Sequence, residues 1–163
     1  NLMEVLRNIE SNIVLVLITS DKSYDNVEWV WGYKETDKVG GKDIYSGSKG
    51  AAELIIKSYF HSFFNKKDHP VKVGIGRAGN VIGGGDYAPN RLFPDIARSL
   101  NSKIKVKIRN PKSTRPWQHI FDCLNGYLNT TIYCDKNKIQ FSNWNFSPSY
   151  KSMTVKKIIS LLR

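Results

Sequence analysis

A tyrosine and a lysine lie four residues apart at the start of a helical segment, in the stretch KDIYSGSKGAAELIIKSYF (42–60). Side chains at this spacing share one face of a helix, so the phenol of Tyr45 lies next to the ammonium of Lys49. A nearby positive charge stabilises a phenolate and lowers the tyrosine pKa, as a base that deprotonates a sugar hydroxyl requires. A surface tyrosine beside a solvated lysine has the same spacing, so the pair alone is weak support for catalysis.

Three further polar residues lie upstream, where a predicted strand ends. Ser20, Asp21 and Lys22 stand at the end of the apolar run IVLVLITS (13–20). A hydroxyl at this position could bond the tyrosine oxygen and polarise a substrate. The combination of a polar strand exit with a Tyr/Lys helix favours a catalytic site over a surface pair.

The segments that must hold these residues alternate between strand and helix patterns, which indicates an α/β fold with a parallel sheet. The run 13–20 is rich in leucine and β-branched residues, so we expect a strand covered on both faces. The helix within 42–60 has apolar residues on several faces, so we expect it to be well buried. A second strand at 71–79 leads into a glycine-rich turn at the sheet edge where open α/β sheets bind ligands. We also predict helices at 91–100 and after Ser152 or Thr154, and a short strand near 139–146.

Composition limits the classes of function. The chain has 163 residues and 40% hydrophobic content, enough for one domain or part of one. Its net charge of +11 would suit an anionic partner, but lysines recur throughout and no nucleic-acid module is recognisable, so we expect no nucleic-acid partner. Cys123 and Cys134 form no metal-ligand pattern, which indicates no metal site and a reducing, cytoplasmic setting. The apolar run 12–18 is too short to cross a bilayer, so we expect no membrane partner.

Five motifs resemble, in order and spacing, the extended short-chain dehydrogenase/reductases that act on nucleotide sugars. They are TSDKSYDN (19–26), WGYKETDKVGGKDIYSGSKGAAE (31–53), RAGNVIGGGDYAPNRLFPD (77–95), IRNPKSTRPWQH (108–119) and NFSP (145–148). The resemblance implies a Rossmann-like doubly wound parallel sheet with NAD as cofactor and a nucleotide sugar as substrate. It also implies a homodimer, formed through the helix that bears the tyrosine and lysine.

Within this family the chain is similar to the 4,6-dehydratases that act on CDP-glucose. The resemblance implies oxidation of the sugar at C4, loss of water across C5 and C6, and return of the hydride to C6. Tyr45 would take the C4 hydroxyl proton, and Lys49 would lower its pKa and bond the nicotinamide ribose, so both would contact the cofactor. Ser20 would bind the C4 oxygen and Asp21 would protonate the departing C6 hydroxyl. Lys22 stands where the related dTDP-glucose enzymes carry a glutamate that removes the C5 proton.

The remaining site residues suit a diphosphate. Arg115 resembles a diphosphate-binding arginine, and the planar guanidinium fork matches paired phosphate oxygens. Asn80 resembles the asparagine that contacts the sugar diphosphate, although an asparagine in a turn can also serve a backbone with positive φ. Arg91 and Arg109 are weaker candidates of the same kind, since solvated surface arginines are equally expected in so basic a chain.

The sequence departs from the family pattern at its two ends. The G-x-x-G-x-x-G turn that holds the NAD pyrophosphate in this family is not found, and we expect the final helix to be cut short. We therefore expect one internal part of a longer enzyme, inactive alone, comprising the second half of the dinucleotide-binding domain and part of the substrate-binding lobe. The alternatives are a dehydratase or 4-epimerase for dTDP-, GDP- or UDP-sugars, and a non-catalytic basic binding module, which would show salt-sensitive DNA binding.

Overall fold

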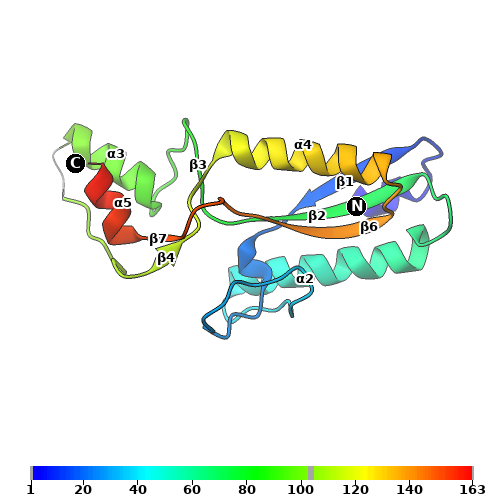
Figure 1. Cartoon of the computed structure of the whole chain (residues 1–163), viewed down its shortest axis with the longest axis horizontal. Helices are drawn as coiled ribbons and strands as arrows, with labels where there is room; N and C mark the ends of the chain where they lie inside the picture. The colour runs from blue at the N-terminus through cyan, green and yellow to red at the C-terminus, as the bar shows by residue number, and fades with distance from the viewer. Residues whose placement is uncertain (1, 103–104, 163) are drawn as a thin grey trace.

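A three-stranded parallel sheet forms the centre of the computed structural model, which describes residues 2–102 and 105–162. The strand order is β1 (Ile13–Ile18), β2 (Val71–Ala78) and β6 (Phe141–Phe146). Helix α2 (Ile44–Tyr59), continued by the π-helical turn η2 (Phe60–Phe64), covers one face, and α4 (Ile120–Lys136) covers the other (Figure 1). The predicted α/β class with a doubly wound parallel sheet is thereby confirmed.

The smaller elements include α1 (Leu2–Leu6) before β1 and the 3-10 turn η1 (Asp21–Ser23) after it. Beyond the carboxyl ends of the sheet, β3 (Val81–Ile82) pairs in parallel with β5 (Gln118–His119), and β4 (Thr114–Arg115) pairs antiparallel with β7 (Met153–Thr154). Helices α3 (Leu92–Ser102) and α5 (Val155–Leu161) lie beside these pairs (Figure 1). Residues 87–119 and 147–163 are named the second lobe below.

The main hydrophobic core lies between the sheet and the helices α1, α2 and η2. Its buried members are Met3, Leu6, Ile56, Phe60, Phe64, Val71, Val73 and Ile75. Helix α2 is less buried than the sequence predicts, because Leu54 and Ile55 point away from the sheet and are 55% and 61% exposed. The expectation of a well-buried helix was wrong within the described part of the chain: the face that packs on the sheet carries Glu53 as well as Ile56.

Strand β1 also differs from its prediction. It is an edge strand that pairs only with β2 among the described residues, and its side chains are half-buried, with Ile18 55% exposed. The interior strand β2, by contrast, is buried over nearly its whole length. The apolar run therefore identified a strand correctly, but among residues 2–102 and 105–162 the expected cover is only partial: Ile13, Leu15 and Leu17 pack against the core and α4 contacts the strand, while its side chains stay half-buried.

Candidate active site

A cleft of about 760 Å³ opens at the carboxyl ends of β1 and β2, facing the second lobe. Ser20, Asp21 and Lys22 line it from η1, and Tyr45 lines it from the first turn of α2. The glycine-rich turn that follows β2 supplies a further wall, and Arg91 and Arg115 enter from the second lobe. Residues far apart in the sequence thus meet at the edge where parallel α/β sheets bind their ligands.

The turn η1 fixes Ser20 and Asp21 at the floor of this cleft. The Ser20 hydroxyl caps the turn by accepting a hydrogen bond from the Lys22 backbone N–H at 3.2 Å, and it donates to Asp21 Oδ1 at 3.1 Å. Burial raises the pKa of Asp21, and the hydrogen bond from Ser20 and the charges of Lys22 and Arg115 only partly oppose this. A raised pKa favours the protonated carboxyl, which is the form that a general acid needs.

Tyr45 and Lys49 lie on one face of α2, as their spacing predicts. The Lys49 Nζ atom is 5.8 Å from the centroid of the Tyr45 ring, and the Tyr45 side chain is 55% exposed. The helix begins immediately before this pair, because Asp43 caps it by accepting from the Ser46 backbone N–H at 3.0 Å. Tyr45 lines the cleft itself, whereas Lys49 stands one turn behind it.

The predicted diphosphate-binding residues divide into two groups. Asn80, Arg91 and Arg115 line the cleft, and Arg91 also pairs with Asp86 at 3.2 Å. Arg109 lies instead in a neighbouring pocket and donates to the Asn90 carbonyl at 3.5 Å, so the structure does not bring it to the cleft. Asn80 has no positive φ, which removes the alternative that it serves only a strained turn.

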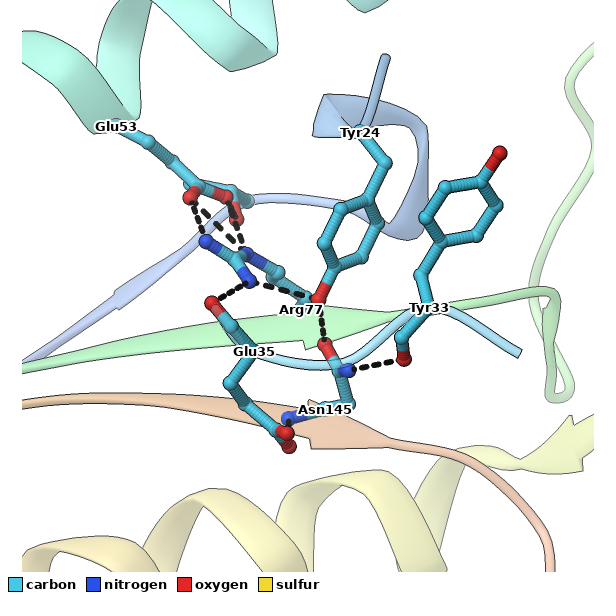
Figure 2. Close-up of polar contacts among 7 residues, drawn as sticks. Tyr24, Tyr33, Glu35, Glu53, Arg77 and Asn145 are labelled. Atoms are coloured by element: carbon cyan, nitrogen blue, oxygen red, sulfur yellow. Dashed lines mark hydrogen bonds and ion pairs between the residues drawn. The ribbon is translucent and has the colours of Figure 1, made fainter. Parts of the chain in front are cut away.

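A buried ion pair, which the sequence analysis missed, holds α2 against the sheet. Arg77 at the end of β2 and Glu53 on α2 have side chains only 2% and 3% exposed (Figure 2). The Arg77 Nε atom donates to the two carboxylate oxygens of Glu53 at 2.9 and 3.0 Å, and a second guanidinium nitrogen contacts the same carboxylate. Thr19, at the end of β1, donates to Glu53 at 2.7 Å. The Glu53 carboxylate therefore links α2 to the two neighbouring strands β1 and β2.

The same arginine anchors the long loop between η1 and α2. Arg77 donates to the Tyr24 hydroxyl at 2.7 Å and to the Glu35 carbonyl at 3.0 Å, and Tyr24 in turn donates to Asn145 Oδ1 at 2.7 Å (Figure 2). Asn145, on β6, donates through its side chain to the Tyr33 carbonyl at 3.0 Å. The loop is thereby fastened to two strands of the sheet, next to the residues of η1 that line the cleft. Arg77, a charged residue near the end of the buried strand β2, was the signal in the sequence that could have indicated this ion pair.

Small residues let the loop between η1 and α2 pack directly on α2. A Cβ atom at Gly50 would lie 2.8 Å from the Gly40 carbonyl oxygen, and one at Gly41 would lie 2.3 Å from the Gly47 nitrogen. The loop and the first turns of α2 thus touch through their backbones. The small residues beside Tyr45 and Lys49 therefore serve to bring loop and helix together.

Among residues 2–102 and 105–162, no group of three or more histidine, cysteine, aspartate or glutamate side chains is placed to hold a metal ion. Within the same residues, no helix combines the length and apolar character that a membrane span requires. His119 has a structural position, since its side chain caps α4 by accepting from the Phe121 backbone N–H at 3.2 Å.

Comparison with known proteins gives consistent matches. Residues 1–135 match the model of the NAD dependent epimerase/dehydratase family. The CDP-glucose 4,6-dehydratase of Salmonella typhimurium is 48% identical over 152 residues, which cover 91% of this chain and 42% of that protein. The chain therefore spans less than half the length of this curated relative.

Solved structures of similar fold cover nearly the whole chain. UDP-glucuronic acid 4-epimerase from Bacillus cereus, in complex with UDP-glucuronic acid and NAD, matches with a TM-score of 0.83 at 20% identity, over 99% of this chain and 48% of that one. The dTDP-glucose 4,6-dehydratase from Bacillus anthracis, in complex with NAD, matches with a TM-score of 0.73 at 22% identity, over 99% of this chain and 49% of that one. At these identities the likeness concerns the fold.

Proposed function

The chain belongs to the NAD dependent epimerase/dehydratase family, and from this premise we propose that the protein is a nucleotide-sugar 4,6-dehydratase acting on CDP-glucose. The observation that carries the proposal is the presence of Asp21 and Lys22 in the same cleft as Tyr45. A 4-epimerase has no elimination step and needs no such acid and base beside its tyrosine. The identity to a CDP-glucose 4,6-dehydratase supports the same substrate.

The proposed reaction starts at the C4 hydroxyl of the sugar. Tyr45, as phenolate, removes the hydroxyl proton, and the positive charge of Lys49 stabilises that phenolate. NAD, when bound, would supply the acceptor for the C4 hydride and the donor that returns it to C6. Tyr45 and Lys49 fit a role beside the nicotinamide ribose, because the Lys49 ammonium can donate to ribose hydroxyls, the Tyr45 phenolate can accept from them, and the Tyr45 side chain is half-exposed at the cleft.

Elimination of water then requires one proton to be given and another to be taken. Asp21 donates its proton to the C6 hydroxyl as the C6–O bond breaks, and the raised pKa of its buried carboxyl supports that role. Lys22 takes the proton from C5, which the adjacent 4-keto group acidifies. A lysine accepts a proton only in its neutral form, which desolvation favours. Lys22 is exposed in the described structure, so this desolvation must come from the bound substrate.

The cleft also suits the diphosphate. We propose that Arg115 and Asn80 bind its oxygens and that Arg91 assists them, since all three line the cleft that holds the proton-transfer residues. Arg109 is retained only as a candidate for a more distant part of the nucleotide, because it lies in the neighbouring pocket.

We further propose that the protein is a cytoplasmic homodimer that associates through α2. Leu54 and Ile55 support this interface, because both side chains are more than half exposed on the helix face that points away from the sheet. An aliphatic pair of this kind is stabilised when a second copy covers it. Light scattering of the unaltered protein and of Leu54→Arg tests the interface: a dimer is expected for the first and a monomer for the second.

The test of the activity is turnover of CDP-glucose with NAD by the protein produced from its complete gene, following the 4-keto product by its absorbance in alkali. Tyr45→Phe and Lys22→Ala are each expected to lower kcat by about 10²–10⁴-fold. Lys34→Ala, in the exposed loop, is the matched control and should leave turnover unchanged. Product from another nucleotide sugar but not from CDP-glucose would transfer the chemistry to that substrate, and the absence of product from every nucleotide sugar would reject the proposal.

A further inference from the structure

The net positive charge of the chain is confined to the second lobe. Residues 87–119 and 147–163 contain 12 lysines and arginines and one acidic residue, whereas the other 113 residues contain 13 basic and 13 acidic residues. The whole formal charge of +11 thus resides in 50 residues. A general compositional bias toward lysine would spread the excess over both parts. The apparent scatter of lysines along the sequence is therefore misleading once the lobe boundaries are known.

Most charged side chains of the second lobe that the structure describes are exposed, and most form no ion pair within the described residues. Its single acidic residue, Asp95, pairs with Arg98. Lys112, Lys156 and Lys157 are exposed, and none of them forms an ion pair within the described residues. The fold brings them together, because the Lys156 backbone N–H donates to the Pro111 carbonyl at 2.9 Å and so holds the start of α5 against the turn before β4.

These lysines do not serve the stability of the lobe. The first turn of α5 contains Lys156 and Lys157 and no acidic residue. Positive charge is unfavourable at the amino end of a helix, where the backbone N–H groups already carry a partial positive charge. Like charges in close proximity repel each other as well. Electrostatics within the lobe therefore does not account for the placement of these lysines.

The elements that carry these lysines are joined to elements that line the candidate active site. Arg115 lines the cleft from β4, and β4 pairs with β7 directly before α5. Arg91 enters the same cleft from the start of α3. We propose that the second lobe attracts the anionic diphosphate of the nucleotide substrate and so accelerates its association, an inference that rests on the proposed function. The electrostatic field of a charged protein surface can raise the association rate of an oppositely charged ligand about 10- to 10³-fold, and salt weakens this effect steeply.

The test is the association rate of CDP, the probe that carries the diphosphate without the sugar. Stopped-flow tryptophan fluorescence would follow binding to the full-length protein, since Trp117 lines the cleft. The lobe variant is Lys112→Gln/Lys156→Gln/Lys157→Gln, and the matched control is Lys57→Gln/Lys66→Gln/Lys67→Gln, three exposed lysines at the end of α2 and in the turn after η2, away from the lobe (Figure 1).

For an assumed separation of about 15 Å, three unit charges acting on a dianion should change the rate about five-fold at an ionic strength of about 10 mM, and less than about two-fold at about 0.15 M. We expect the lobe variant to bind CDP about five-fold more slowly at low salt, with the dissociation rate unchanged. The control should match the unaltered protein, and cytidine, which has no phosphate, should be insensitive to both variants.

Equal association rates for the two variants, or no binding of CDP at all, would overturn the proposal. The proposal would also be overturned if the unaltered protein bound a DNA duplex, the lobe variant did not, and both associated with CDP at the same rate. The positive surface of the second lobe would then serve a nucleic acid. Turnover of CDP-glucose, measured in parallel, separates this inference from the proposed function. If the protein dehydrates CDP-glucose but its association rate with CDP does not depend on salt, only the steering proposal is rejected. If the lobe accelerates CDP association but no CDP-glucose is dehydrated, only the dehydratase proposal is rejected.

Discussion

Replacing Glu53 by glutamine is expected to destabilise the protein strongly, because it leaves the buried charge of Arg77 without its counter-ion. The two side chains are only 2% and 3% exposed, and Arg77 directs two of its nitrogens at the Glu53 carboxylate. Removing one member of a buried ion pair costs about 3–5 kcal/mol, against a total of about 5–15 kcal/mol for a typical domain. With a urea m value of about 2 kcal/mol/M, the unfolding midpoint should fall by about 1.5–2.5 M.

The destabilisation should depend on pH in a defined direction. Burial opposes the ionisation of Glu53, but hydrogen bonds from Arg77 and Thr19 outweigh it, so the net pKa of Glu53 is lowered. A lowered carboxyl pKa contributes stability above the pKa of the unfolded chain, about 4.3, and this contribution is lost as the pH falls through the folded value. The difference between the unaltered protein and Glu53→Gln should therefore be full at pH 7 and shrink below about pH 4.

Urea unfolding followed by tryptophan fluorescence at pH 7 and at about pH 3.5 provides the measurement. Lys57→Gln, on an exposed face of the same helix, is the control and should change stability by less than about 0.5 kcal/mol. The double variant Glu53→Leu/Arg77→Met removes both charges and should recover most of the loss. A loss below about 1 kcal/mol for Glu53→Gln at pH 7, or an equal loss at both pH values, would refute the reasoning.

Three further substitutions test the packing and the electrostatics of the site. Gly50→Ala places a methyl group 2.8 Å from the Gly40 carbonyl oxygen and should lower the free energy of unfolding in urea by about 1–3 kcal/mol. Gly47→Ala, whose added methyl group has no neighbour within 4 Å, should raise it by up to about 1 kcal/mol through helix propensity. Equal effects of the two substitutions would contradict the close contact at Gly50. Burial raises the pKa of Asp21, so its ionisation lowers the stability of the fold as the pH rises from the unfolded pKa through the folded one. Asp21→Asn should therefore raise Tm at pH 7 and leave it unchanged at pH 3. The same substitution should lower kcat about 10²–10⁴-fold. A Tm gain that is the same at both pH values would show that ionisation is not its cause.

The sequence by itself determined those features that depend on local spacing. The four-residue interval puts Tyr45 and Lys49 on one face of α2 because a helix repeats every 3.6 residues. The apolar runs that became β1 and β2 end where Ser20 and Asn80 follow, so a parallel sheet necessarily brings these residues to one edge. The motifs of the nucleotide-sugar enzymes were readable for the same reason, since each is a short continuous stretch.

Other features were decided by the tertiary structure alone. Glu53 and Arg77 are 24 residues apart, and nothing local shows that two charged side chains share a dry interior position. The exposure of Ile18 and Leu54 depends on which neighbours cover an edge strand and an outer helix face, which periodicity does not specify. The charge of the second lobe is present in the sequence, yet it becomes visible only when two separated stretches are folded into one body. Burial and charge density are properties of neighbours in space, and chain order fixes those neighbours only through the fold.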